Sequence, residues 1–540
     1  MSSPDNSLAI GATAAAAAAS SKAKSRILLV ASLVSSLIML DSNVLAVSLP
    51  SIARSLGASF TDIEWVVSSY ILTYASLLLA AGSYADLHGR RKTMVAGLVV
   101  FALASLACGL AGNVLLLNVS RAGQGVGGAL LLTSSLAIIG HEFSGAERAR
   151  AFAFWGASLG VALAVGPILG GAIAHFVGWR WIFLINLPLC VILTLAAFRT
   201  TPESLDPRAQ KLDFRGIATF SGGLGLLIWA LIDGNGLGWA DSRILLRLGG
   251  AGLLFALFVR EESRQVRPMV DLELFRRPTF VGAVASMIGY GASAQVMIFF
   301  LPLYLQDAYG FQPLVAGVAM IPFAFPMVLA PRVFAGLGAR FSGRTILTAG
   351  LIVTLLGNLA FWAAARIHLS YAMFLLPMLV AGCGAGLLNG ETVKVLGGAV
   401  PPERAGMAGG LAGTTRFVGI LVSIAGLGAV LSSTSYHAFV SAAVALGISP
   451  EAARVAARQV ASGNLAEILA AFPDSLRSKL QAIAQISFAQ GFAAAALVAA
   501  GVAAMAGAVT FMLVRRADTL PVGAPRAAPP CFAIDCRQPL

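Results

Sequence analysis

Charged residues are scarce in this sequence. Only 11% of its 540 residues are charged, whereas a soluble domain carries about 25%, and the mean hydropathy is +0.84. No Asp, Glu, Lys or Arg occurs from Thr93 to Ser120 or from Ala151 to Trp179. Each run exceeds the ~20 residues that cross a bilayer as a helix, and neither has the alternating pattern of a membrane β-strand. The composition therefore excludes a soluble protein and predicts an all-α polytopic membrane protein.

Cysteine and histidine are also few, with five of each. Cys531 and Cys536, near the C-terminus, are spaced neither for a zinc site nor for prenylation. The histidines are scattered over separate loops and helix ends: His88, His141, His175, His368 and His437. This distribution disfavours the nucleophile–base or metal cluster of an enzyme, and the Gly-x4-Gly-Lys-Ser/Thr phosphate loop is missing. We expect no catalytic residues, no metal and no cofactor.

The apolar runs between polar segments predict about 14 membrane helices. Thr61 and Glu64 fit the Ser/Thr-x-x-Glu capping box, which predicts one helix start near Glu64. The predicted helices are 27–50, 64–81, 93–112, 114–140, 151–174, 181–198, 215–233, 243–260, 279–304, 313–332, 345–365, 370–394, 408–432 and 486–514.

The basic residues predict the orientation of the chain. Most of the 37 Lys and Arg fall on the side that the N-terminus shares, as expected for cytoplasmic segments. The net charge of +13 therefore reflects membrane topology, and we expect no nucleic-acid partner. Residues 1–26 and 515–540 are predicted to be cytoplasmic tails, the first of them disordered.

An internal repeat divides the chain. Gly82–Arg90 has a degenerate copy in Gly336–Arg344, and "AGQGVGG" and "ERAR" recur as "AGCGAGL" and "ERAG" at a nearly constant offset. We therefore predict two similar six-helix bundles, 27–198 and 279–514, joined by a linker, 199–278, with two further membrane helices. Such parallel halves are a transporter architecture with a central site between them.

Several motifs carry a family resemblance over roughly residues 27–516. They are "LDSNVLAVSLP" (40–50), "GSYADLHGRRK" (82–92), "RAGQGVGGA" (121–129), "GPILGG" (166–171) and "GWRWIFLINLP" (178–188). With these motifs the sequence resembles the major facilitator superfamily, and within it the 14-helix drug:proton antiporters. The resemblance implies two pseudo-symmetric bundles and export by alternating access.

The loop motif combines two glycines, one acid and several basic residues: Gly82, Asp86, Gly89, Arg90 and Arg91. The glycines permit a tight turn and the basic residues hold the loop on the cytoplasmic side. The resemblance implies that the cluster gates the inner faces of the two halves. The alternative, a plain topology anchor, explains the basic residues alone. The second copy has Arg340 in place of the acid, so the gate would be asymmetric.

Two charged residues are predicted to lie in mid-span. Asp41 stands some 14 residues after Ile27, where an ionised carboxylate is costly and proton binding is coupled to the surroundings. Arg121 stays charged and needs a carboxylate, a carbonyl or water. The resemblance implies that both take part in proton coupling. The alternatives are a structural aspartate and an arginine that snorkels from a helix end.

"GPILGG" supplies the antiporter motif, namely Gly166, Pro167, Gly170 and Gly171. Small residues permit tight helix packing and the proline bends the helix. The resemblance implies a role in the turn between states, and generic packing is the alternative. One upstream glycine of the family pattern is Ala162 here, a mild departure.

A second acid, Glu391, lies near a predicted helix end. It is either an ion pair with Lys394 or a second site for a cation or proton, and Arg416 is another possible partner. Candidate cavity residues are Trp65, Tyr70, Gln124, Gln295 and Arg416. The segment 433–485 is predicted to be the one long outward loop, helical from Ser449 and again from Asp474, and it either covers the outer mouth or has no role in transport.

Together these features predict a proton-coupled exporter of lipophilic, cationic drugs or toxic compounds in the inner membrane, with both termini cytoplasmic. A dedicated exporter of a metabolite such as an amino acid, sugar or siderophore is the alternative, since one scaffold serves many solutes. We expect a small-molecule substrate, protons and lipid as partners, and a monomer.

Overall fold

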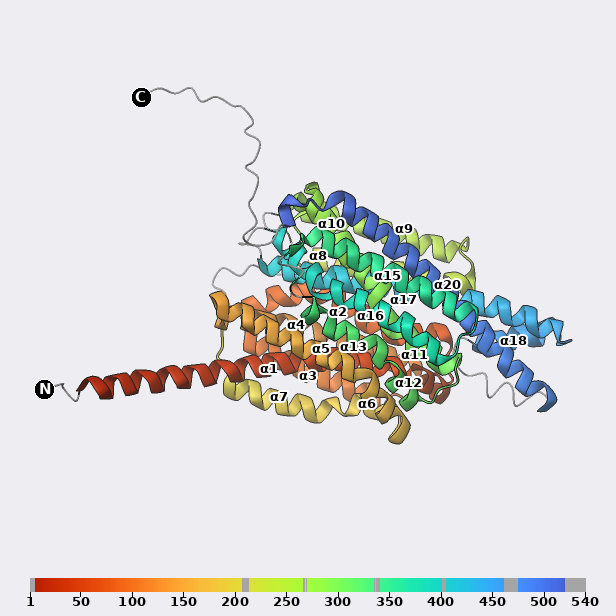
Figure 1. The fold of residues 1–540 in the computed structure, drawn as a ribbon, viewed down its shortest axis with the longest axis horizontal. Coiled ribbons are helices and arrows are strands. Elements are labelled where there is room, and N and C mark those ends of the chain that lie inside the picture. The colour runs from red at the N-terminus through yellow and green to blue at the C-terminus, as the bar shows by residue number, and fades with distance from the viewer. Residues whose placement is uncertain are drawn as a thin grey trace, which may run out of the picture.

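The computed structural model describes residues 5–205, 213–265, 268, 270–334, 336, 340–400, 405–460 and 474–519. All regular secondary structure in these segments is helical, and 14 helices there are long and apolar enough to cross a membrane. The helices form one elongated bundle (Figure 1). The prediction of an all-α polytopic membrane protein is confirmed.

Six membrane spans precede the linker helices and six follow them. The first bundle contains α1 Asp5–Leu56, α2 Phe60–His88, α3 Arg90–Gly109, α4 Val114–Glu142, α5 Gly145–Phe176, α6 Arg180–Leu184 and α7 Asn186–Thr200. The linker contains α8 Phe214–Leu237 and α9 Ser242–Arg264, followed by the short η1 Leu272–Arg276. The second bundle contains α10 Pro278–Gly289, η2 Tyr290–Gln295, α11 Met297–Asp307, α12 Pro313–Ala319, α13 Ile321–Val333, α15 Gly343–Arg366, α16 Tyr371–Gly398, α17 Ala405–Ala445, α18 Pro450–Val460 and α20 Asp474–Leu513, and η4 Ala517–Thr519 follows.

The start of α2 differs from the prediction. Its N-cap is Ser59, whose side chain accepts a hydrogen bond from the Asp62 backbone N–H, while the Asp62 carboxylate accepts one from the Ser59 N–H at 2.9 Å. This is a capping box of the predicted kind, but it lies two residues before Thr61 and Glu64. The assignment of Glu64 as a capping residue is wrong, and its carboxyl is free for another role.

The N-terminal segment also differs from the prediction. Residues 1–26 were expected to be disordered, yet α1 begins at Asp5 and runs unbroken into the first span. The segment is rich in alanine, which has the highest helix propensity, and α1 extends well beyond the bundle in Figure 1.

The expected outward loop 433–485 is shorter in the structure. Helix α17 continues to Ala445, and α20 begins at Asp474, because neither extension contains a proline that would break the helix. The helical stretches predicted from Ser449 and from Asp474 correspond to α18 and to the start of α20. These parts project from the end of the bundle opposite the N-terminus (Figure 1).

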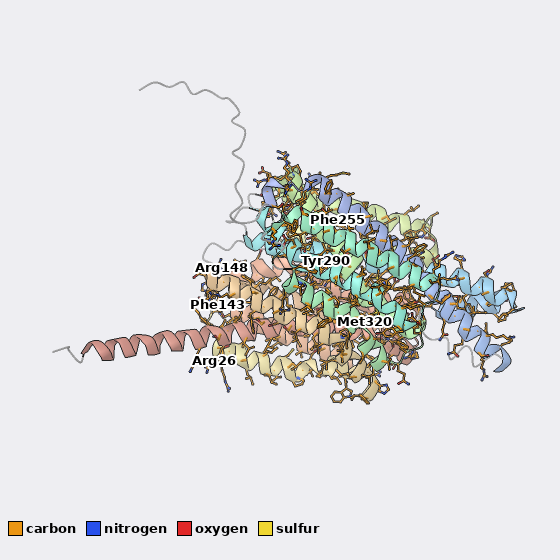
Figure 2. The ribbon with its side chains drawn as sticks, viewed as in Figure 1. Arg26, Phe143, Arg148, Phe255, Tyr290 and Met320 are labelled. Atoms are coloured by element: carbon orange, nitrogen blue, oxygen red, sulfur yellow. The ribbon has the colours of Figure 1, made fainter. Side chains whose placement is uncertain are left out.

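The cytoplasmic end assigned from the sequence is rich in basic residues. Arg26, Phe143 and Arg148 lie at one end of the bundle (Figure 2). There Lys24 pairs with Glu147 at 2.8 Å, and the Arg148 guanidinium donates to the Phe143 carbonyl at 2.8 Å. These contacts join α1, α4 and α5 at this end.

Among the described residues, the two bundles meet chiefly where α2 packs on α17, α5 on α12 and α13, and α1 on α11 and α12. At the end predicted to face outward, the Gln306 side chain of α11 donates to the Val47 carbonyl of α1 at 2.7 Å. The linker helix α8 packs against both α2 and α17. The linker therefore lies beside the contact between the bundles, and the outer ends of α1 and α11 are held together.

Candidate functional site

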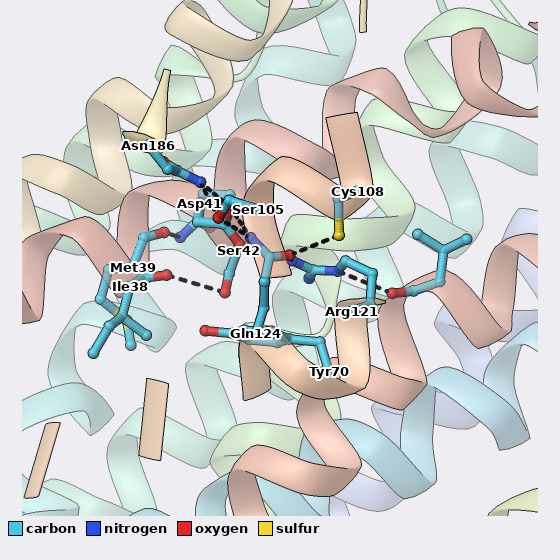
Figure 3. A network of polar contacts seen from close by, with 12 residues as sticks. Ile38, Met39, Asp41, Ser42, Tyr70, Ser105, Cys108, Arg121, Gln124 and Asn186 are labelled. Carbon is cyan, nitrogen blue, oxygen red and sulfur yellow. Dashed lines mark hydrogen bonds and ion pairs between the residues drawn. The ribbon is translucent and has the colours of Figure 1, made fainter. Parts of the chain in front are cut away.

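The centre of the first bundle contains a buried ion pair. The Arg121 Nη1 of α4 donates to the Asp41 Oδ2 of α1 at 2.7 Å, and the exposed fractions of the two residues are 1% and 2%. Figure 3 shows both side chains pointing toward each other. Arg121 therefore finds the carboxylate partner that a mid-span arginine requires, and because it is buried it does not snorkel to a membrane surface.

The second oxygen of Asp41 is held by two amides. The Asn186 Nδ2 of α7 donates to Asp41 Oδ1 at 2.7 Å, and the Gln124 Nε2 donates to the same oxygen at 3.3 Å. Gln124 also donates to the Ser105 hydroxyl of α3 at 2.7 Å. The carboxylate thus accepts hydrogen bonds at both oxygens, and the network joins α1, α3, α4 and α7 (Figure 3).

Arg121 has further partners in α2 and in its own helix, α4. Its Nε donates to the Val66 carbonyl at 3.2 Å, its Nη1 also reaches Gln124 Oε1 at 2.8 Å, and its guanidinium lies 4.2 Å from the centroid of the Tyr70 ring. Cation–π contacts of this kind stabilise a desolvated guanidinium. A change of charge at Asp41 would therefore alter the contacts that Arg121 makes with α2.

A chain of aromatic side chains continues from Tyr70 into the second bundle. Tyr70 stacks on Tyr74 with centroids 5.8 Å apart, and Tyr74 meets the Phe417 ring of α17 edge-on at 4.6 Å. The Arg416 guanidinium lies 5.4 Å from the Phe417 centroid and 5.7 Å from that of Tyr290, a residue in the middle of the molecule (Figure 2). Arg121 and Arg416 are thus connected by rings across the contact between the bundles.

Several polar atoms of the aromatic chain and of the η2 turn are buried and make no hydrogen bond: Tyr70 Oη, Tyr74 Oη, Gln295 Oε1 and Arg416 Nε. Gln295 belongs to η2, a π-helical turn, and such turns occur often at functional sites. Two of the predicted cavity residues, Tyr70 and Arg416, therefore belong to the aromatic chain, and Gln295 lies in the same helical turn as Tyr290. Gln124 belongs to the Asp41 network instead, and Trp65 packs half-buried against the apolar core.

The loop motif forms a compact cluster at the cytoplasmic end. Arg90 donates to Asp86 Oδ1 through Nε at 3.0 Å and through Nη2 at 2.8 Å. Gly89, with φ +107°, ends α2 and precedes α3, a conformation that favours glycine. The Glu203 carboxylate accepts hydrogen bonds from the Arg91 and Lys92 backbone N–H groups at 3.1 and 3.2 Å. These contacts join the loop to itself and to the start of the linker, and among the described residues none of them reaches the second bundle.

The antiporter motif occupies a crossing of three helices. A side chain at Gly166 or Gly170 would overlap Asn43 or the Val44 backbone of α1, and one at Gly171 would overlap the Pro313 carbonyl of α12. The glycines therefore let α5 approach α1 and the second bundle at once. Pro167 lies within α5, and its carbonyl is approached closely by Gly317 of α12.

Glu391 lies far from this network in the structure. It forms an ion pair with Lys394 at 3.3 Å, and the Lys394 side chain is 63% exposed. The geometry is that of the i, i+3 pair expected from the spacing. The structure thus favours the ion-pair alternative and does not bring Glu391 to Asp41 or to Arg416.

Sequence reasoning missed three polar residues of these sites: Asn186, Ser105 and Glu203. Asn186 had a signal, because it is an amide within the apolar motif "GWRWIFLINLP". Ser105 had none, since serine is common in membrane helices, and Glu203 follows the last span of the bundle without any motif. Their roles depend on partners far away in the sequence.

Two six-helix bundles, the first with a buried carboxylate–arginine pair at its centre, are typical of secondary membrane transporters. A model of the Major Facilitator Superfamily matches residues 31–424, and this chain belongs to that family. It is a multi-pass membrane protein.

Two curated relatives and one solved structure are similar to this chain. It is 34% identical over 398 residues to the multidrug resistance protein Stp of Mycobacterium tuberculosis, covering 74% of each chain. It is 30% identical over 487 residues to the tetracenomycin C resistance and export protein of Streptomyces glaucescens, covering 89% of this chain and 90% of that one. A bacterial homologue of the human lysosomal transporter Spinster has the same fold, with a TM-score of 0.63 at 17% identity over 92% of this chain and 98% of that one. The resemblance stated from the motifs is confirmed.

Proposed function

We propose that this chain is a proton-coupled antiporter that exports lipophilic, cationic drugs or toxic compounds from the cytoplasm by alternating access. It works in the inner membrane with both termini cytoplasmic, as a monomer, and the proton gradient supplies the energy without a cofactor. The names of its relatives, a multidrug resistance protein and an antibiotic export protein, support the substrate class. The observation that carries the proposal is the buried Asp41–Arg121 pair.

Proton binding at Asp41 would change this pair. A protonated carboxyl has lost the charge that attracts Arg121 and can no longer accept hydrogen bonds equally at both oxygens. The guanidinium would then rely on Val66 and Gln124, which it already contacts. Because Val66 belongs to α2 and α2 packs on α17, protonation of Asp41 would shift the contact between the bundles. This sequence links a proton to the change of access.

The substrate region is proposed to lie along the aromatic chain between the bundles. Faces of Tyr70, Tyr74, Tyr290 and Phe417 can hold a planar cation, and the unpaired atoms of Gln295 and the two tyrosines there can hydrogen-bond to it. A cation would compete with Arg121 and Arg416 for these rings, so that binding of substrate and the position of the arginines are coupled.

The test of export is transport of an ethidium-type dye into inverted membrane vesicles. An acidic lumen, generated before the dye is added, should drive dye uptake, and an uncoupler should abolish it. Vesicles without the protein provide the control. If dyes of a broad panel are not moved on a gradient, while cell metabolites elicit proton exit from the lumen, the drug-export proposal fails and the chain is a metabolite exporter.

A further inference from the structure

Glu64 is a second buried acid, distant from the Asp41 network. It lies one turn after the start of α2, at the end of the bundle assigned to the outside, and only 6% of it is exposed. Its Oε1 is buried and has no hydrogen-bond partner. An ionised carboxylate without a partner is costly at such a position. The groups around Glu64 therefore decide whether its carboxyl is charged.

The carboxyl of Glu64 lies between the two bundles. A side chain at Gly428 of α17 would overlap the Glu64 carboxyl oxygen and approach the Phe60 ring. Glycine at 428 is therefore what allows α2 and α17 to close over the carboxyl. From Gly426 to Leu431, α17 carries only glycine and apolar residues, and it offers no side chain that could pair with a negative charge.

The linker contributes a like charge. Asp233 of α8 lies within electrostatic range of Glu64, and its own carboxylate is paired with Arg247 of α9 at 2.6 Å. Arg247 also lies over the Trp229 ring at 4.1 Å. The Arg247 guanidinium is thus held by Asp233 and Trp229, while the Glu64 carboxyl is covered by Gly428 and has the like charge of Asp233 within electrostatic range. This setting suits a neutral carboxyl.

We infer that Glu64 is a proton-binding site that controls closure of the outer end of the α2–α17 contact. The bundles close there only when the Glu64 carboxyl carries a proton. When the outer ends part, water reaches the carboxyl, which then ionises and holds the entrance open until a proton arrives from outside. The inference rests on the proposed function in one respect, namely that the outer ends part during the cycle.

The test measures closure directly, without transport. Spin labels are placed at Ser55 and Gln312, which are exposed at the outer end of the two bundles, by cysteine substitution in the full-length protein with its native cysteines replaced. Distances between the labels are measured at about pH 5 and about pH 9, because the protonation of a buried carboxyl depends on pH. We expect a short distance at acidic pH and a long one at alkaline pH, and Glu64→Gln should give the short distance at both.

Two variants separate this site from the other acids. Asp307 also lies at the outer end, with a buried Oδ2 that has no partner, and Asp307→Asn should keep the pH response. Asp41→Asn shifts the contact between the bundles under the proposed function, but it should keep the lengthening at alkaline pH while losing proton-coupled dye transport, so that failure of the proposed function is distinguishable from failure of this inference. If Asp307→Asn abolishes the response, or Glu64→Gln retains it, the inference is overturned.

A second experiment tests the same inference without the Glu64→Gln variant. Gly428→Ala should overlap the carboxyl and give the long distance at both pH values. Because Glu64→Ala removes the overlapping atoms, the double variant should recover the short distance. A short distance in Gly428→Ala alone at acidic pH would show that the carboxyl does not occupy the closed contact, and would also overturn the inference.

Discussion

Asn186 donates a hydrogen bond of 2.7 Å to the Asp41 oxygen that faces away from the Arg121 Nη1 contact. The Asp41 carboxylate is therefore held from two sides, by a cation on α4 and by an amide on α7. This arrangement fixes the carboxylate and makes the network sensitive to a proton at either oxygen.

Replacing Asn186 by Leu removes the amide while keeping an apolar side chain of similar size. A hydrogen bond to a charged group contributes about 1.5–3 kcal/mol, so we expect dye transport on a proton gradient to fall by about tenfold or more, with a shifted pH profile. Asn118→Leu serves as the control, because Asn118 lies one turn before Arg121 and has a buried oxygen without a partner. Equal transport by both variants would contradict the role of Asn186.

Gly171→Ala places a methyl group where α5 meets the Pro313 carbonyl of α12. Because a backbone atom cannot move aside as a side chain can, we expect the outer ends of α5 and α12 to separate and dye transport to be largely lost, while membrane insertion is unchanged. Gly156→Ala on the same helix is the matched control, since a methyl group there meets no atom within 4 Å. Loss of transport in both variants would point to a general effect of helix substitution.

Glu203→Ala removes the carboxylate that accepts hydrogen bonds from the first N–H groups of α3. Loss of a helix cap costs about 0.5–2 kcal/mol, and we expect a lower midpoint of thermal unfolding in detergent. The control is Glu142→Ala, whose acid pairs with the neighbouring His141 at the end of α4. An unchanged midpoint in Glu203→Ala would mean that the cap does not stabilise the loop.

Phe417→Ala interrupts the aromatic chain between the two bundles. An edge-on contact of this kind contributes about 0.5–1.5 kcal/mol, so we expect the KM for a planar cationic dye to rise about two- to tenfold. Phe417→Tyr keeps the ring and should restore the KM. If the KM is the same in all three proteins, the dye does not bind along these rings.

The sequence predicts the membrane helices and singles out Asp41 and Arg121 for the same physical reason. Charge inside a long apolar run is costly, so both residues are conspicuous in the sequence, but the partner of Arg121 could have been a carboxylate, a carbonyl or water. Asn186 and Ser105 are neutral and cost little in a helix, and their place beside Asp41 depends on how α3 and α7 pack. No local pattern contains that information.

Glu64 shows how a local pattern misleads. Thr61 and Glu64 match the capping box as well as Ser59 and Asp62 do in their spacing, but only the latter pair stands where α2 begins. The boundary of the helix decides which acid caps it, and boundaries are the least certain part of a sequence-based prediction. The predicted bounds of the spans in α17 and α20 were too narrow for a related reason, since the polar residues that end the apolar runs do not end the helices.

The most direct test of the account compares proton exit and dye uptake in inverted vesicles for the wild type, Asp41→Asn and Asp241→Asn. Asp241 lies before α9, outside the spans, where hydrogen bonds from Arg243 lower its pKa, and asparagine can replace it as a helix cap. We expect dye uptake to release protons from the lumen in the wild type and in Asp241→Asn. We expect Asp41→Asn neither to release protons nor to concentrate dye on the gradient. Undiminished dye uptake coupled to proton exit in Asp41→Asn would contradict the account.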